Sequence, residues 1–72
     1  MSHALQEHFR RLASAYPEIR LQDMLFFDNE RWNIGEVSKL GVVSIHCPDG
    51  MTREIWEEGL VTFREKAAAL QK

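Results

Sequence analysis

The sequence predicts an α/β fold, because strand-like and helix-like stretches alternate along its 72 residues. Residues 24–28 and 42–47 are short runs rich in apolar and β-branched side chains, which is typical of strands. Apolar residues recur at helical spacing before, between and after these runs. We therefore expect the order α-β-α-β-α, with the two strands parallel and joined by a right-handed crossover.

The first helix is predicted over residues 2–16, with Ser2 as its N-cap residue. Pro17 ends this helix, because the residue before a proline is pushed out of the α region. Residues 17–22 then form a linker to the first strand. The spacing of the apolar residues predicts one inward face, which consists of Leu5, Phe9, Leu12 and Tyr16.

The first strand is a continuous apolar run at 24–28, so we expect helices to cover both of its faces. The next helix is predicted over 29–41, with Lys39 in its last turn. Gly41 stands where a left-handed residue commonly follows a helix. The side chains predicted to face the core are Ile34, Val37 and Leu40.

The second strand is predicted at 42–47, with a turn at 48–50 and a long helix over 52–72. The apolar residues of this helix also fit a coiled-coil seam, but over barely two heptads an inward core face is the better interpretation. That stripe consists of Trp56, Leu60, Phe63, Ala67 and Leu70.

The composition narrows the classes of function. The net charge is −2, both signs are interspersed and no basic patch stands out, so we expect no nucleic-acid partner. The longest apolar runs are only about five residues, far shorter than a membrane span, so we expect no membrane association. The first residues lack the apolar core of a secretory signal. Cys47 is the single cysteine and cannot form an internal disulfide, so a cytoplasmic location is expected.

Oxygen-bearing side chains follow the first strand. In open α/β sheets ligands bind beyond the carboxyl ends of the strands, where Asp28 and Asn29 lie on the first strand. Cys47, Asp49 and Gly50 lie beyond the second. A helix that starts after Asn29 adds a positive terminus that favours phosphate, and together these groups indicate a hard cation such as Mg²⁺. The alternative, which is compatible with a metal site, is that Asp28 or Asn29 caps the helix.

Two other groups of residues have simpler interpretations. His46 and Cys47 are adjacent on a strand and therefore point to opposite faces, so Cys47 is interpreted as a small buried hydrophobe and not a nucleophile. Trp32 and Trp56 are interpreted as packing groups, although Trp32 could border a pocket near Asn29.

Three stretches together resemble a known family. "MLFFDNERWNIGEVSKLGV" is similar to the last conserved motif of the magnesium-dependent phosphatases, a branch of the haloacid dehalogenase superfamily. The positions that match this motif are Asn29, Asn33, Ile34, Val37 and Gly41. "HFRRLASAYPEI" resembles the preceding helix of these phosphatases, and "VVSIHCPDGMT" resembles their final strand and loop.

The resemblance implies a partial Rossmann-like, haloacid dehalogenase-like unit, with residues 1–72 as one partial domain from the C-terminal segment of such a phosphatase. It implies magnesium-dependent hydrolysis of a phosphomonoester, of the phosphotyrosine or sugar-phosphate type, through an aspartyl-phosphate. Asp28 and Asn29 are then the metal ligands, and Arg31 and Asn33 lie around them or in the phosphate pocket. Because Asn29 is neutral and the chain offers no other acidic ligand beside Asp28, Mg²⁺ binding by this chain alone is expected to be weak or absent.

Several groups that the family's chemistry needs are absent from the chain. The nucleophile and the acid/base form an Asp-x-Asp pair in the family, but the aspartates here are Asp23, Asp28 and Asp49, none of them two positions apart. Leu5 stands where the resemblance places the phosphate-contacting lysine. Asn29 also replaces the commoner acidic residue.

Two hypotheses follow. In the first, the chain is the C-terminal segment of a phosphatase, inactive alone and completed by an N-terminal half that supplies the missing groups. In the second, it is a non-catalytic α/β interaction module derived from that fold. Both use an open strand edge, since a two-stranded parallel sheet leaves edges free to pair with a protein partner.

Overall fold

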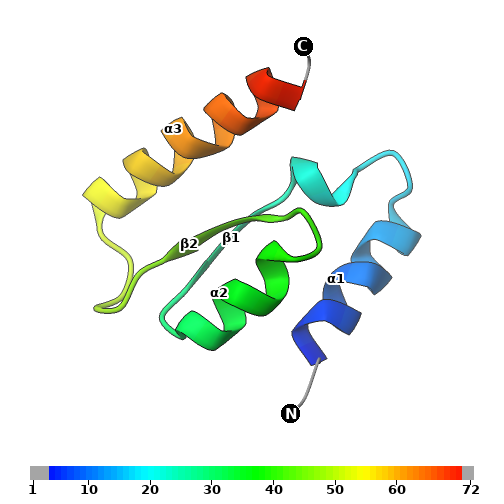
Figure 1. Cartoon of the computed structure of the whole chain (residues 1–72), viewed down its shortest axis with the longest axis horizontal. Coiled ribbons are helices and arrows are strands. Elements are labelled where there is room, and N and C mark those ends of the chain that lie inside the picture. Colours follow the sequence, from blue (N-terminus) through cyan, green and yellow to red (C-terminus); the bar gives the residue numbers. More distant parts are fainter. Residues whose placement is uncertain (1–3, 71–72) are drawn as a thin grey trace.

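A computed structural model describes residues 4–70 of the chain (Figure 1). It has three α-helices, one short 3₁₀ helix and two strands. In chain order these are α1 (Ala4–Ala15), the 3₁₀ helix η1 (Leu21–Asp23), β1 (Leu25–Asp28), α2 (Arg31–Ser38), β2 (Val43–His46) and α3 (Arg53–Leu70). The predicted α-β-α-β-α order is confirmed, and the predicted N-cap Ser2 lies outside the described residues.

The two strands pair in parallel, in the register that places Leu25 beside Val43 and Asp28 beside His46. The fold is therefore the open α/β unit that was predicted, with a partial Rossmann-like arrangement. Within residues 4–70 each strand pairs on one edge only, so the described sheet has two free edges. These edges carry backbone groups that can accept a further strand.

Helices α1 and α2 pack on one face of the sheet. The core of this layer consists of Phe9, Val37 and Val42, and Phe26 of β1 packs against it with its ring edge-on to Phe9 at a centroid distance of 5.4 Å. Val37 is 0% exposed, as its predicted inward position requires. Burying one such side chain contributes about 1.5–3 kcal/mol, so this layer is a main source of stability. The buried Gln6 side chain ties α1 to α2 by donating to the carbonyl of Glu36 at 2.7 Å.

Helix α3 packs on the opposite face of the sheet. Neighbouring strand residues point to opposite sides, so Phe26 faces α1 and α2 whereas Phe27 faces α3. The α3 residue Gly59 is buried over the ring of Phe27 and beside Ile45. The Trp56 ring lies 5.7 Å from that of Phe27. Both faces of β1 are thus partly covered, and all four of its residues are half-buried.

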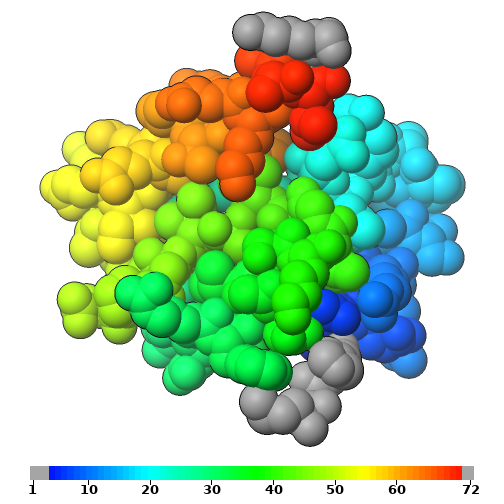
Figure 2. Space-filling view, viewed as in Figure 1, coloured from blue at the N-terminus to red at the C-terminus, as the bar shows by residue number. Residues whose placement is uncertain are grey.

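The stripe predicted for α3 is only partly inward. Leu60, Phe63 and Ala67 are half-buried, whereas Trp56 and Leu70 remain 47% and 59% exposed. A single helix covers this side of a two-stranded sheet, so the ends of α3 extend beyond the surface that could bury them. Figure 2 shows α3, in yellow to red, along the upper left of the molecule beside the green atoms.

The predicted helix and strand ends hold to within about two residues, except at the end of α2. This helix ends at Ser38, three residues before the predicted end, so Lys39 is its C-cap residue and the prediction that it lies in the last turn is wrong. Helix α1 ends at Ala15 before Pro17, and Gly41 has the predicted left-handed conformation with φ of +94°. The last two residues of the predicted linker, Leu21 and Gln22, belong to η1, so that part of the linker prediction is wrong. Arg20 and Asp23 close that turn through a side-chain pair, and the Arg20 hydrogen bonds hold the pKa of Asp23 below its ordinary value. Tyr16, predicted to face inward, is exposed because α1 has already ended.

Among residues 4–70, none of the helices has the length and apolar character needed to cross a membrane.

Candidate functional site

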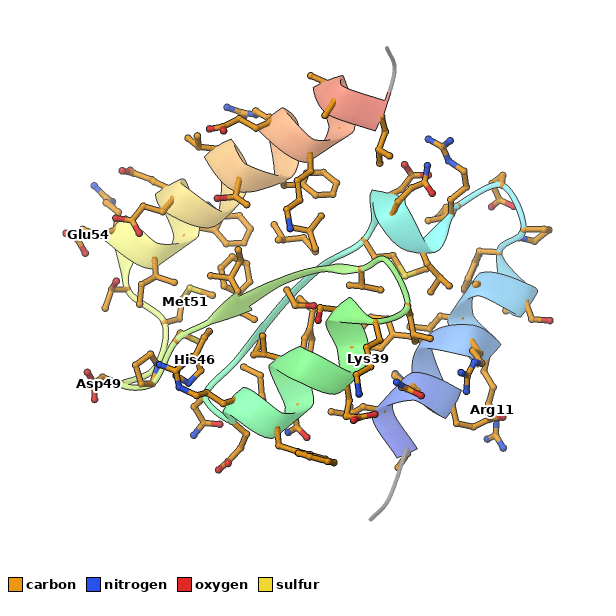
Figure 3. All side chains as sticks on the ribbon, viewed as in Figure 1. Arg11, Lys39, His46, Asp49, Met51 and Glu54 are labelled. Atoms are coloured by element: carbon orange, nitrogen blue, oxygen red, sulfur yellow. The ribbon has the colours of Figure 1, made fainter. Side chains whose placement is uncertain are left out.

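The carboxyl ends of both strands lie at the same edge of the sheet, since the strands are parallel and Asp28 pairs with His46. The chain leaves β1 at Asp28, bends at Asn29 and enters α2 at Arg31. Asn33 of α2 turns back toward the strand end. We call Asp28, Asn29, Asn33 and His46 the strand-end corner, of which Figure 3 labels His46.

One oxygen of the Asp28 carboxylate is fixed by two donors. The side-chain amide of Asn33 donates to Oδ2 at 2.8 Å, and the backbone N–H of Glu30 donates to the same oxygen at 3.3 Å. The other oxygen, Oδ1, receives no hydrogen bond from the described residues. The carboxylate is therefore oriented, with one oxygen left to bind a ligand.

The prediction that Asp28 or Asn29 caps α2 is wrong. The N-cap residue is Glu30, and its side chain makes no capping hydrogen bond. Asp28 instead lies within the strand and holds the Glu30 N–H one residue before the helix begins. Two residues separate Asp28 from the first helical residue, Arg31, so Asp28 is not the N-cap. Its carboxylate therefore makes no capping hydrogen bond within the helix.

Asn29 is exposed, and its side-chain amide makes no hydrogen bond to another described residue. Its backbone is held more firmly, because the carbonyl oxygen lies 3.0 Å from Nε2 of His46. The carbonyl of Asp28 accepts from the N–H of Cys47 at 2.9 Å, which extends the strand pairing by one step. The Asn29 side chain is thus free to reach a ligand from a fixed backbone.

The structure places Arg31 and Asn33 differently. Asn33 contacts Asp28 directly and so orients the predicted metal ligand. Arg31 is exposed in the first turn of α2 and forms no ion pair within residues 4–70, so its place in a phosphate pocket stays a prediction. Trp32 is 49% exposed, so about half of this side chain is covered, and its interpretation as a packing group stays a prediction.

The residues beyond β2 do not converge on the corner. Cys47 is buried, as predicted for a small hydrophobe. Asp49 and Gly50 lie in an exposed turn, where Gly50 has φ of +89° and donates to the Cys47 carbonyl at 3.1 Å. Figure 3 shows Asp49 at the outer tip of this turn, directed away from His46.

The donor set suits one side of a magnesium site. Mg²⁺ in proteins takes one or two carboxylates, with water and substrate phosphate as its other ligands. The corner offers the unbonded Oδ1 of Asp28 and the unbonded amide of Asn29. Among residues 4–70 no cluster of three or more His, Cys, Asp or Glu side chains could hold a metal by itself. The corner therefore fits a cation whose remaining ligands come from elsewhere.

His46 was not predicted to belong to this site, because the sequence indicated only that it points to the face opposite Cys47. The predicted second strand ended one residue later, at Cys47, so the prediction did not bring His46 to the end of the strand. Two parallel strands of similar length bring their last residues side by side, and Asp28 and His46 are those residues.

Comparison with known proteins agrees with the resemblance drawn from the motifs. The profile of the acid phosphatase family matches residues 1–66. A human protein named magnesium-dependent phosphatase 1 is 48% identical over 56 residues. That match covers 78% of this chain and 31% of the human protein, so the chain spans about a third of that relative. On this similarity, which runs through both strands and the corner between them, the chain belongs to the acid phosphatase family.

Proposed function

We propose that the chain is the C-terminal segment of a magnesium-dependent phosphomonoester phosphatase of the haloacid dehalogenase type. The observation that carries the proposal is the oriented carboxylate of Asp28, which stands at the carboxyl edge of a parallel sheet with one oxygen unbonded. Ligands bind at this edge in open α/β sheets. Membership of the acid phosphatase family, and similarity to a protein named as a magnesium-dependent phosphatase, support the same reaction class.

The residues of the strand-end corner would have different roles in binding the metal ion and the substrate phosphate. Asp28 would hold Mg²⁺ through Oδ1, and Asn29 would add its amide oxygen. Asn33 keeps the Asp28 carboxylate in its rotamer by donating to Oδ2. Arg31, at the start of α2, would contact the substrate phosphate, which a planar guanidinium suits well. When bound, the magnesium ion supplies positive charge that stabilises the negative charge of the transferring phosphoryl group.

The chain alone lacks the attacking group. The family's chemistry proceeds through an aspartyl-phosphate on an Asp-x-Asp motif, and Asp23, Asp28 and Asp49 form no such pair. Leu5 stands at the place of the family's lysine. We therefore infer that this segment is inactive by itself and that an N-terminal half completes it. The free edges of the described sheet offer that half a place to add strands.

The segment's location is part of the same proposal. Cys47, the chain's single cysteine, is a buried free thiol, which suits the reducing conditions of the cytoplasm.

The proposal is tested by hydrolysis of p-nitrophenyl phosphate with and without Mg²⁺. The purified chain is measured first alone and then after addition of a fragment carrying the N-terminal half of a related phosphatase. We expect no turnover from the chain alone and magnesium-dependent turnover from the mixture. The control is the same fragment with the nucleophilic aspartate changed to asparagine, which must abolish the turnover. Magnesium-dependent turnover by the isolated chain would contradict the proposal.

A second candidate is a non-catalytic interaction module that pairs with a protein partner through a free sheet edge. The neutral Asn29, at the place of a commoner acid, is the observation that favours it. Sedimentation of the chain mixed with the N-terminal fragment separates the two candidates when it is combined with the assay. Association without any turnover supports the module, whereas association with turnover supports the phosphatase.

A further inference from the structure

We propose that His46 is a positioning residue of the strand-end corner, and that it fixes the backbone from which Asp28 and Asn29 reach a divalent cation. The inference rests on the proposed function, because it takes the corner as the cation site. It adds a residue of β2 to a site that was otherwise built from β1 and α2.

The position of His46 is set by the sheet. It ends β2 directly beside Asp28 and lies 17 residues from Asn29 in the sequence. Its Nε2 lies 3.0 Å from the carbonyl oxygen of Asn29. Because His46 and Asp28 are paired in register, they point to the same face of the sheet, the face on which α2 lies. The imidazole therefore reaches the bend that follows β1 without distorting either strand.

The hydrogen bond to the Asn29 carbonyl determines which nitrogen of the His46 ring carries the proton. A carbonyl oxygen only accepts hydrogen bonds, so Nε2 of His46 must donate. A nitrogen that donates a hydrogen bond has no lone pair for a metal ion. Nε2 is thus assigned as a support of the corner and not as a metal-binding atom, while Nδ1 of the neutral ring keeps its lone pair.

Besides the bond from the Ile34 N–H to the Glu30 carbonyl, four hydrogen bonds hold the carbonyls of Asp28 and Asn29 and the Asp28 carboxylate. Two come from the end of β2, namely the His46 side chain to the Asn29 carbonyl and the Cys47 N–H to the Asp28 carbonyl. The other two hold Oδ2 of Asp28. Of these four, only the His46 bond acts on Asn29, which is otherwise an exposed bend. Its loss should release the residue that presents the second ligand.

The test uses Mn²⁺ as a paramagnetic probe on the full chain, with broadening of backbone amide signals as the readout. His46→Ala removes the donor, and His46→Gln replaces it, since a glutamine amide nitrogen occupies nearly the place of Nε2. Ser44→Ala is the matched control, because Ser44 lies on β2 and loses a side-chain bond to the Val42 carbonyl without touching Asn29.

We expect Mn²⁺ to broaden the amides of residues 28–30 first, and excess Mg²⁺ to reverse this. His46→Ala should weaken Mn²⁺ binding about three- to tenfold, the usual worth of one hydrogen bond. It should also speed amide hydrogen exchange at residues 29 and 30 by a similar factor without any metal. His46→Gln and Ser44→Ala should match the unchanged chain in both measurements.

The outcomes separate the inference from the function beneath it. If the unchanged chain shows no preferential broadening at 28–30, the cation site and the inference both fail. If it shows broadening that His46→Ala leaves unchanged, the inference alone fails. If His46→Ala does not fold, the ¹⁵N chemical shifts of the imidazole in the unchanged chain test the inference instead. Shifts that show a proton on Nε2 support the hydrogen bond to the Asn29 carbonyl, and shifts that show Nε2 without a proton overturn it.

Discussion

Replacing Asp28 with asparagine is expected to lower the magnesium-dependent turnover of the completed phosphatase by about 100-fold to 1,000-fold. Asp28 supplies the one carboxylate of the strand-end corner. Opposite unit charges about 4 Å apart attract by roughly 4 kcal/mol at an effective dielectric near 20, and that attraction is lost when the carboxylate becomes an amide. Asparagine has nearly the same shape, so the loss reports the charge and not the packing.

The measurement is the p-nitrophenyl phosphate assay on the chain combined with its N-terminal fragment, over a range of Mg²⁺ concentrations. Asp49→Asn is the matched control, because it makes the same change in charge on an exposed turn beyond the other strand. We expect Asp49→Asn to retain full turnover. Equal effects of the two substitutions would show that Asp28 acts only through net charge, and would remove it from the site.

The Gly59→Ala variant should be less stable than the unchanged chain by about 1–3 kcal/mol, the usual cost of overpacking a core. Alanine normally stabilises the interior of a helix relative to glycine, by up to about 1 kcal/mol. At Gly59 the sign reverses, because an added Cβ would lie 2.5 and 2.7 Å from two carbons of the Phe27 ring. That ring also packs against Trp56 and is not free to swing away. Helix α3 must therefore lift from the sheet or the ring must shift.

Urea unfolding followed by circular dichroism measures this effect. Gly35→Ala is the control, since Gly35 lies in α2 with no atom within 4 Å of an added Cβ, and it should raise stability. The double variant Gly59→Ala with Phe27→Leu should cost less than the sum of the two single changes, because the smaller side chain vacates the space. A Gly59→Ala variant as stable as Gly35→Ala would show that α3 does not pack on β1 as described.

The order and direction of the elements could be predicted because local patterns determine them. The apolar run at 24–28 and the β-branched run at 42–47 contrast sharply with the helical spacing between them. The parallel direction of the strands follows from the helix that joins them. A connection of this strand–helix–strand type is almost always right-handed. The inward position of Val37 follows from the same helical period.

What could not be predicted depends on contacts between distant residues. Apolar spacing predicted a buried stripe on α3, but how much of Trp56 and Leu70 is covered depends on the width of the sheet beneath. The N-cap was predicted at Asp28 or Asn29, whereas the backbone stays extended through Glu30, with φ of −97° and ψ of 116°.

The candidate site also has a part that could be predicted from the sequence and a part that could not. Asp28 and Asn29 could be located from the sequence because strand ends mark the ligand edge of such folds. The hydrogen bond between Asn33 and Asp28 was beyond sequence reasoning, since it depends on a rotamer, and so was the contact of His46 with the Asn29 carbonyl.

The most direct test of the central claim is a Mg²⁺ titration of the isolated chain, followed by backbone amide shifts, with and without Asn29→Asp. The claim is that Asp28 and Asn29 form a cation-binding corner. A second carboxylate should then strengthen Mg²⁺ binding at least about fivefold, even if water screens the added charge fully. The shifts should be confined to residues 28–33. An Mg²⁺ affinity that Asn29→Asp leaves unchanged, or shifts spread evenly over the chain, would contradict the claim.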